Sequence, residues 1–91
     1  MSGTERRPFG ASERAALMRA FGERVGRHRL AAGLSEEELA ARCGVSASSI
    51  KKTELGRKEP RLSLILMLCT RLGLSPDALM RGLLVRKGAR R

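Results

Sequence analysis

Apolar residues recur along most of this chain at the three- and four-residue spacings that helices produce. The first stripe has intervals of four, three and four residues, which places its members on one helix face. Its members are Phe21, Val25, His28 and Ala32. No segment alternates between apolar and polar residues with period two, and β-branched residues are few. The pattern therefore predicts an all-α protein.

Glycines and serines divide this pattern at helix-sized intervals. Each glycine follows an apolar stretch, as glycines at helix C-termini do, and each serine precedes one, as N-caps do. The glycines are Gly33, Gly44, Gly56 and Gly73, and the serines are Ser35, Ser46 and Ser75. The spacing predicts five helices, at approximately 12–32, 36–43, 47–54, 62–72 and 76–84.

The helix expected at 36–43 begins with a capping box. Ser35 precedes it and Glu38 follows three residues later, so each side chain can bond the other residue's backbone N–H. The run Glu36–Glu38 also suits the positive end of the helix dipole, and we interpret it as a solvated face rather than a metal site. The last helix begins at Ser75, Pro76 and Asp77, which are respectively a cap, a preorganised first residue and an acid.

The helix expected at 62–72 is apolar on more than one face. One stripe is predicted to face the core: Leu62, Ile65, Leu68, Cys69 and Leu72. A second stripe contains Leu64 and Met67, and we expect it to form an exposed apolar surface together with Met80, Leu84 and Val85. Scattered surface hydrophobes are the plainer alternative. A clustered surface predicts a homodimer.

Length and charge restrict the function classes. The 91 residues suit one domain, 12–85, between a flexible basic arm at 1–11 and a basic C-terminal arm at 86–91. The net charge is +10, and residues 56–91 carry nine basic against two acidic residues. This excess favours a polyanionic partner, nucleic acid ahead of an anionic membrane. With two Phe and no Trp or Tyr, the chain is a poor candidate for base stacking on single strands or RNA.

Several other classes find no support in the sequence. No apolar run reaches the roughly 20 residues of a membrane span, and the N-terminus lacks a signal-peptide core, so we expect a cytoplasmic, nucleoid-associated protein. Cys43 and Cys69 are expected to be buried, reduced thiols, and His28 is expected to pack against the core. These three residues do not have the spacing of a zinc site. No nucleophile–base pair, metal cluster or phosphate-binding glycine loop is visible, which argues against an enzyme or a cofactor.

Residues 35–56 form the most informative segment. Two helices of about eight residues are separated by the four residues 43–46, which suits a helix-turn-helix whose second helix enters the DNA major groove. All-helical domains also contain such pairs without contacting DNA. The residue string is more specific than the geometry: it reads GLSEEELAARCGVSASSIKKTELGRKEP.

This string closely resembles the phage-repressor-like (Cro/Xre) helix-turn-helix family, and the likeness extends over about residues 21–83. The matching residues are Gly33-Leu34-Ser35, Leu39-Ala40, Gly44-Val45-Ser46, Ile50, Glu54, Gly56 and Pro60, then Leu72-Gly73-Leu74-Ser75 and Leu79. The resemblance implies a five-helix lambda-repressor-like DNA-binding domain with residues 47–54 in the major groove. The composition, rich in Arg and poor in Lys, is typical of a bacterium with a high-GC genome.

The resemblance also implies roles for individual residues. It assigns base contacts to Ser46, Ala47, Ser48 and Lys52. It assigns phosphate contacts to Lys51, Arg57, Lys58 and the amide end of the second helix at Glu36. Arg29 and Glu54 match a structural ion pair that ties the first helix to the third.

Four departures from the family pattern limit direct base readout. Glu36 stands where Gln is common, and its carboxylate would repel a phosphate unless it turns away. Ala47, Ser48 and Ser49 are short. Thr53 replaces a large apolar residue, and Arg61 replaces a capping Ser. We therefore expect specificity to depend on DNA shape or on Lys52.

The sequence thus predicts a sequence-specific double-stranded DNA-binding transcriptional regulator, a repressor that binds as a homodimer. Basic residues of the two arms would add phosphate contacts: Arg6, Arg7, Arg86, Lys87, Arg90 and Arg91. The alternative is a protein-interaction module, such as an antitoxin or regulatory partner, that binds another protein through Leu64, Met67 and Leu84.

Overall fold

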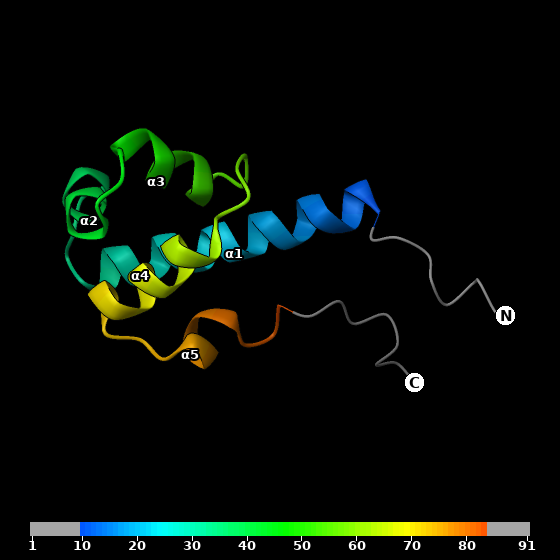
Figure 1. Ribbon diagram of the computed structural model, residues 1–91. Coiled ribbons are helices and arrows are strands. Elements are labelled where there is room, and N and C mark those ends of the chain that lie inside the picture. Colours follow the sequence, from blue (N-terminus) through cyan, green and yellow to red (C-terminus); the bar gives the residue numbers. More distant parts are fainter. Residues whose placement is uncertain (1–9, 84–91) are drawn as a thin grey trace, which may run out of the picture.

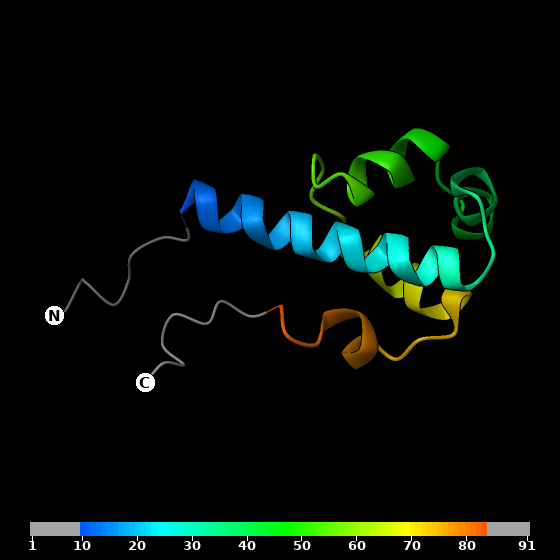
Figure 2. The ribbon, with the colours of Figure 1, turned by 180° about the vertical axis from the view of Figure 1, so that it is seen from behind.

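The computed structural model describes residues 10–83, and within that range it contains five helices and no strand, which confirms the all-α prediction. Their bounds are α1 Ala11–Ala31, α2 Glu36–Cys43, α3 Ala47–Glu54, α4 Leu62–Leu72 and α5 Pro76–Met80. Figure 1 and Figure 2 show α1 running through the molecule, with α2 and α3 on one side and α5 on the other. In both views the first half of α1 extends past the other four helices.

Local capping signals determine where the central helices begin and end. The bounds of α2, α3 and α4 coincide with the predicted ranges. The Ser35 hydroxyl accepts from the Glu38 N–H at 3.0 Å, and the Glu38 carboxylate accepts from the Ser35 N–H at 2.7 Å, so the capping box is formed. Gly44 and Gly73 cap α2 and α4 with φ of 71° and 68°, the left-handed region that glycine enters at least cost.

The two outer helices differ from the predicted ranges. α1 begins at Ala11, a residue that we had assigned to the N-terminal arm, and the rest of that arm apart from Gly10 lies outside the described residues. α5 ends at Met80 rather than at 84, because Arg81 has a ψ of 132°, which is not helical. Leu84, Val85 and the predicted arm at 86–91 also lie outside the described residues.

One core joins all five helices. Its most deeply buried apolar side chains come one from each helix: Val25, Leu39, Ile50, Leu68 and Leu79, all with 0% exposed. Thr53 is buried among them, and its hydroxyl donates to the Ser49 carbonyl at 2.8 Å. This bond satisfies the buried hydroxyl of Thr53, which stands where the family pattern has a large apolar residue.

The predicted orientation of α4 is wrong at two residues. Leu64 is buried, with 7% exposed, so it does not belong to an outer surface, whereas Leu62, predicted to point inward, is 69% exposed. Met67 is partly buried against the core. Residues 62–68 are apolar except for Ser63, so their spacing does not distinguish the inner face from the outer.

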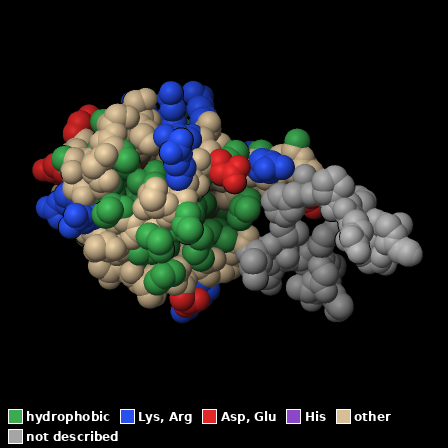
Figure 3. All heavy atoms as spheres, viewed as in Figure 1, with side chains coloured by type: hydrophobic (Ala, Val, Ile, Leu, Met, Phe, Trp, Pro, Cys, Tyr) green, Lys and Arg blue, Asp and Glu red, His purple; other side chains and the backbone are tan. Residues whose placement is uncertain are grey.

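The exposed apolar residues of this region are Leu62, Leu66 and Met80. We call these three residues the α4–α5 surface. Figure 3 shows hydrophobic side chains gathered over α4 and α5 on the face seen in Figure 1. Of the predicted surface residues that the structure describes, only Met80 is exposed, whereas Leu64 is buried and Met67 is partly buried. Leu62 and Leu66, which were not predicted to lie on this surface, are exposed. None of the helices within residues 10–83 is long and apolar enough to cross a bilayer.

Candidate nucleic-acid interface

The position of α3 is determined first by its contact with α1 at Gly22. A Cβ added at Gly22 would lie 2.3 Å from the Thr53 carbonyl oxygen and 2.6 Å from that of Glu54. No side chain fits in this gap, so the two helices approach this closely only because residue 22 is glycine. A glycine that weakens an isolated helix therefore serves packing here.

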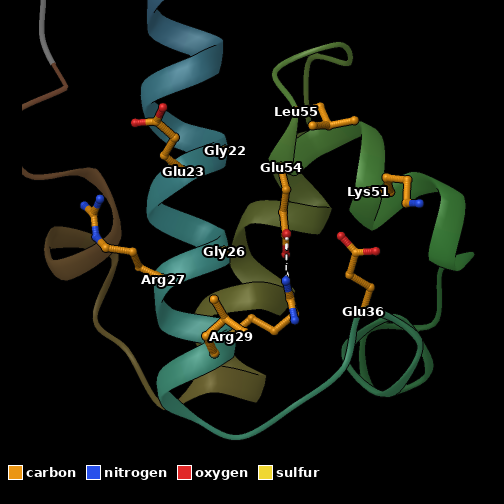
Figure 4. A pocket seen from close by; sticks show the side chains of 10 residues that line it. Gly22, Glu23, Gly26, Arg27, Arg29, Glu36, Lys51, Glu54 and Leu55 are labelled. Atoms are coloured by element: carbon orange, nitrogen blue, oxygen red, sulfur yellow. Dashed lines mark hydrogen bonds and ion pairs between the residues drawn. The ribbon is translucent and has the colours of Figure 1, made fainter.

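An ion pair makes the second link between α1 and α3. The Arg29 guanidinium donates to the Glu54 carboxylate through Nε at 2.6 Å and Nη2 at 3.0 Å, and through Nη1 to the Leu34 carbonyl at 2.9 Å. The two side chains are 12% and 10% exposed, and Figure 4 shows them facing each other between the helices. The hydrogen bond to Glu54 raises the pKa of Arg29 above its ordinary value. The pair that the family resemblance implied is thus present.

The turn between α2 and α3 directs the start of α3. Gly44 ends α2, and the Val45 N–H then donates to the Ala40 carbonyl at 3.0 Å. Ser46 begins α3 as its N-cap, with its hydroxyl accepting from the Ser49 N–H at 3.0 Å. With Ile50 and Thr53 turned inward, the face that carries Ser48 and Lys52 is exposed to solvent.

A basic pocket lies beside this exposed face. It has a volume of about 370 Å³, and three cations line it without any carboxylate. The residues that line it are Ser46, Ser48, Ser49, Lys52, Arg57 and Lys58. We call this the serine–lysine pocket. Five of these six residues are predicted DNA contacts, so α3 and the loop after it bring residues from both predicted classes, base and phosphate contacts, together.

The other predicted contacts lie elsewhere. Lys51 and Glu36 line a larger open groove of about 630 Å³ between α1 and α3, together with Arg29 and Glu54. Figure 4 shows the Glu36 side chain pointing into this groove. Its carboxylate also contributes to the raised pKa of Arg29. Ala47 is partly buried and packs against the core. The structure therefore separates Lys51 and Glu36 from the serine–lysine pocket.

Two residues that matter at this interface were not identified from the sequence. Ser49 was interpreted only as a short side chain, yet it is buried and its hydroxyl accepts from Lys58 Nζ at 2.8 Å. The two residues are nine apart in the chain, and no local pattern links them. Gly22 also takes no part in the sequence-based prediction. Its spacing of four residues from Gly26 is a signal for a close helix contact that could have been used.

Burial also affects the two thiols. Cys43 on α2 and Cys69 on α4 are buried and free, and desolvation raises the pKa of both thiols. The nearby Arg71 charge partly opposes this shift at Cys43. Within residues 10–83, no group of three His, Cys, Asp or Glu side chains is placed to hold a metal ion. The raised pKa values keep both thiols protonated at neutral pH, which does not favour a nucleophilic role.

A family model described as a helix-turn-helix domain matches residues 20–82 of this chain. The chain belongs to the helix-turn-helix domain family. This confirms the resemblance to the phage-repressor-like (Cro/Xre) regulators. The matched range contains the whole two-helix unit, the ion pair and the serine–lysine pocket. It begins at residue 20, so the first half of α1 lies outside it.

Relatives of this helix-turn-helix protein are named as regulators. It is 36% identical over 62 residues to an uncharacterised SPbeta prophage-derived HTH-type transcriptional regulator, YonR, from Bacillus subtilis. That alignment covers 68% of this chain and 57% of the relative, so the chain spans less than two thirds of the relative's length.

Solved structures of two named regulators share the fold. The restriction-modification controller protein C.AhdI from Aeromonas hydrophila is 38% identical with a TM-score of 0.66, covering 71% of this chain and 97% of that one. The clp gene regulator ClgR from Corynebacterium glutamicum is 28% identical with a TM-score of 0.69, covering 82% of this chain and 94% of that one. This chain is thus a member of a family of helix-turn-helix transcriptional regulators.

Proposed function

We propose that this helix-turn-helix protein is a sequence-specific transcriptional repressor that binds double-stranded DNA with α3 in the major groove. The observation that carries the proposal is the serine–lysine pocket. It gathers predicted base-contacting and phosphate-contacting side chains beside the exposed face of α3, and it contains no carboxylate. A repressor acts by occupying an operator, which needs a DNA-binding surface and no catalytic group.

Base readout falls mainly to Lys52. Its side chain is exposed one turn after Ser48, and an ammonium can donate to the O6 and N7 acceptors of guanine. Ser46 and Ser48 add short hydroxyl contacts, and Ala47 offers only a methyl group to a thymine methyl. With such short reading side chains, DNA shape supplies the rest of the specificity.

Phosphate contacts fall on both sides of α3. Arg57 and Lys58 lie on the side of the serine–lysine pocket, whereas Lys51 and the first turn of α2 at Glu36 lie on the side of the α1–α3 groove. A helix in the major groove has a phosphate backbone on either side, so this division fits the proposed docking. Because the Glu36 side chain points into the groove, its backbone amide is the group that would meet a phosphate.

A second copy of this chain is the proposed partner in solution. The α4–α5 surface exposes Leu62 by 69%, Leu66 by 48% and Met80 by 39%. A two-fold dimer through this surface would present two copies of α3 to successive major grooves, about 34 Å apart. Such a dimer reads a pseudo-palindrome.

Selection from random duplexes tests the proposed function. The purified protein is incubated with a random duplex pool at two salt concentrations, and the bound fraction is sequenced. We expect enrichment of a pseudo-palindrome that the double variant Ser48→Ala, Lys52→Ala does not enrich. Binding without enrichment that disappears at moderate salt would contradict the proposal, since it reflects only the +10 charge, and would favour the protein-interaction alternative.

Sedimentation tests the proposed dimer. The double variant Leu62→Glu, Leu66→Glu should sediment as a monomer, because charged residues would face each other across the apolar contact. A matched control is Leu30→Glu, Leu55→Glu, which changes two leucines exposed by 67% and 53% beside the α1–α3 groove and should leave the dimer intact. If the first variant keeps the dimer mass, the α4–α5 surface is not the interface.

A further inference from the structure

Ser49 links the first turn of α3 to the loop between α3 and α4. The residue is buried, with 8% exposed, and all three of its polar groups have partners. Its N–H donates to the Ser46 hydroxyl at 3.0 Å, and its carbonyl accepts from the Thr53 hydroxyl at 2.8 Å. Its own hydroxyl accepts from Lys58 Nζ at 2.8 Å. A buried side chain thus holds the ammonium of a loop lysine.

This bond places the Lys58 charge at a defined point. Lys58 is partly buried, and its side chain reaches back to a residue nine positions earlier in the chain. An ammonium has three N–H donors, so the single bond to Ser49 leaves two for another acceptor. A free lysine side chain loses considerable rotamer freedom when it binds a ligand, whereas a lysine that is already held loses less. Lys58 is therefore preorganised.

The surroundings of Lys58 favour an anion. Lys58 shares the serine–lysine pocket with Arg57 and Lys52, so three positive charges line about 370 Å³ with no carboxylate among them. Like charges this close repel one another, and an anion between them relieves the repulsion. The serine hydroxyls of the same pocket can donate to oxygen acceptors. A phosphate group supplies both the charge and several acceptor oxygens.

We propose that the serine–lysine pocket seats one particular backbone phosphate of the DNA in each half-site, and that Ser49 is the positioning residue for Lys58. This rests on the proposed function and adds two statements to it. The charge of Lys58 acts at one phosphate rather than along the backbone. Its effect depends on a buried hydroxyl that itself does not touch DNA.

Neutral phosphate analogues test whether one backbone phosphate binds in the serine–lysine pocket. Each phosphate of the selected duplex is replaced in turn by an uncharged methylphosphonate, and affinity is measured by fluorescence anisotropy. At one position in each half-site the replacement should weaken the wild-type protein about tenfold and should weaken the variant Lys58→Gln clearly less, since only Lys52 and Arg57 then line the pocket as cations. If every position weakens the two proteins equally, Lys58 has no defined phosphate, and the proposal is overturned.

Ser49→Ala tests the positioning role while keeping every charge. We expect a roughly fivefold loss of affinity, because the Lys58 side chain must then be ordered when DNA binds. The slope of log affinity against log salt should fall by about 0.9, as it should in Lys58→Gln. The double variant Ser49→Ala, Lys58→Gln should bind no more weakly than Lys58→Gln alone. Ser49→Thr, which keeps a hydroxyl, should recover most of the salt slope, and Ser63→Ala, at an exposed serine of α4, should change nothing.

The outcomes separate this proposal from simple loss of fold and from failure of the proposed function. A smaller folded fraction lowers the apparent affinity without changing the salt slope, so an unchanged slope in Ser49→Ala would overturn the positioning role. Additive losses in the double variant would overturn it too. Failure of the proposed function appears earlier and differently, since the wild-type protein would then enrich no operator on which these variants could be compared.

Discussion

The two faces of α3 contrast with each other. The face toward α1 is fixed by a backbone approach at Gly22 that admits no Cβ, by the Arg29–Glu54 pair, and by buried Ile50. The face toward solvent carries short hydroxyls and cations beside an open pocket that lacks carboxylates. One eight-residue helix therefore takes its orientation from one face and leaves the other for a ligand.

We therefore expect substitutions on one face of α3 to change stability and substitutions on the other face to change DNA affinity. Substitutions on the inner face remove contacts that hold the helix in place, so they should lower the free energy of unfolding. Outer-face substitutions other than those at Ser46, which caps α3, and at Lys58, which bonds Ser49, should lower DNA affinity and leave stability unchanged. Variants of each face test this separation.

The largest expected effect comes from breaking the ion pair. Glu54→Leu leaves the Arg29 charge almost buried without its partner, which should lower the free energy of unfolding by about 4 kcal/mol. Urea denaturation measures it. Replacing both partners, as Arg29→Met with Glu54→Leu, should recover more than half of the loss, because no charge is then stranded.

An exposed pair provides the matched control. Arg14 and Glu59 lie 3.8 Å apart with 52% and 68% of their side chains exposed, so Glu59→Leu should cost at most about 0.5 kcal/mol. If Glu54→Leu is as mild as Glu59→Leu, the inner face of α3 is not fixed by charge pairing.

Gly22→Ala should have the next largest effect. The new methyl group would meet the Thr53 and Glu54 carbonyl oxygens, so α1 and α3 must separate, at a cost of about 3 kcal/mol. Thermal unfolding followed by circular dichroism measures it. Gly26→Ala is the control one turn later, where a Cβ would lie 3.3 Å from a Glu54 side-chain oxygen and meet no backbone atom, so we expect a smaller loss. Equal losses of stability at both positions would show that the close approach of α1 and α3 does not depend on glycine at residue 22 in particular.

On the outer face, Ser48→Ala with Lys52→Ala should weaken binding to the selected operator about tenfold and relax its sequence preference. Without DNA, the free energy of unfolding should change by at most about 0.5 kcal/mol, since both side chains are exposed. Anisotropy and thermal unfolding of the same preparation give both values. A marked fall in the free energy of unfolding would contradict the expectation that outer-face substitutions change only DNA affinity.

The smallest effect concerns the buried thiols. Burial raises their pKa above the ordinary value of 9.0, so the thiols contribute stability that is fully present below pH 9.0 and is lost as the pH rises through the folded-state pKa. The free energy of unfolding should therefore fall on this rise in pH. The double variant Cys43→Ala, Cys69→Ala should be less stable at neutral pH but show a flatter decline. An identical pH profile would show that the thiols do not contribute.

Local chemistry made much of the fold predictable. The serine caps and left-handed glycines specify where α2, α3 and α4 begin and end, because caps act within one turn of the chain. α5 is shorter than its apolar pattern suggested, since the pattern continues to Leu83 after the backbone has left the helix at Arg81. The roles of Leu62 and Leu64 were interchanged because a helix that is apolar all round does not reveal which side meets its neighbours.

The candidate site was predictable in its residue types but not in its contacts. A family pattern could name Lys52, Arg57 and Lys58, because their positions in the chain match known positions. It could not show that Lys58 returns to Ser49 or that Glu36 turns into the α1–α3 groove. Those directions depend on the path of the loop and on packing between helices that are distant in sequence.

A map of amide chemical-shift changes, recorded as the selected duplex is added to isotope-labelled protein, tests directly whether DNA binds at the outer face of α3. We expect the largest changes at residues 46–52, at the Glu36 amide, and at Arg57 and Lys58, with small changes at Gly22, Glu23 and Arg27. Changes centred instead on the α1–α3 groove or on the α4–α5 surface, with residues 46–52 unaffected, would contradict this expectation.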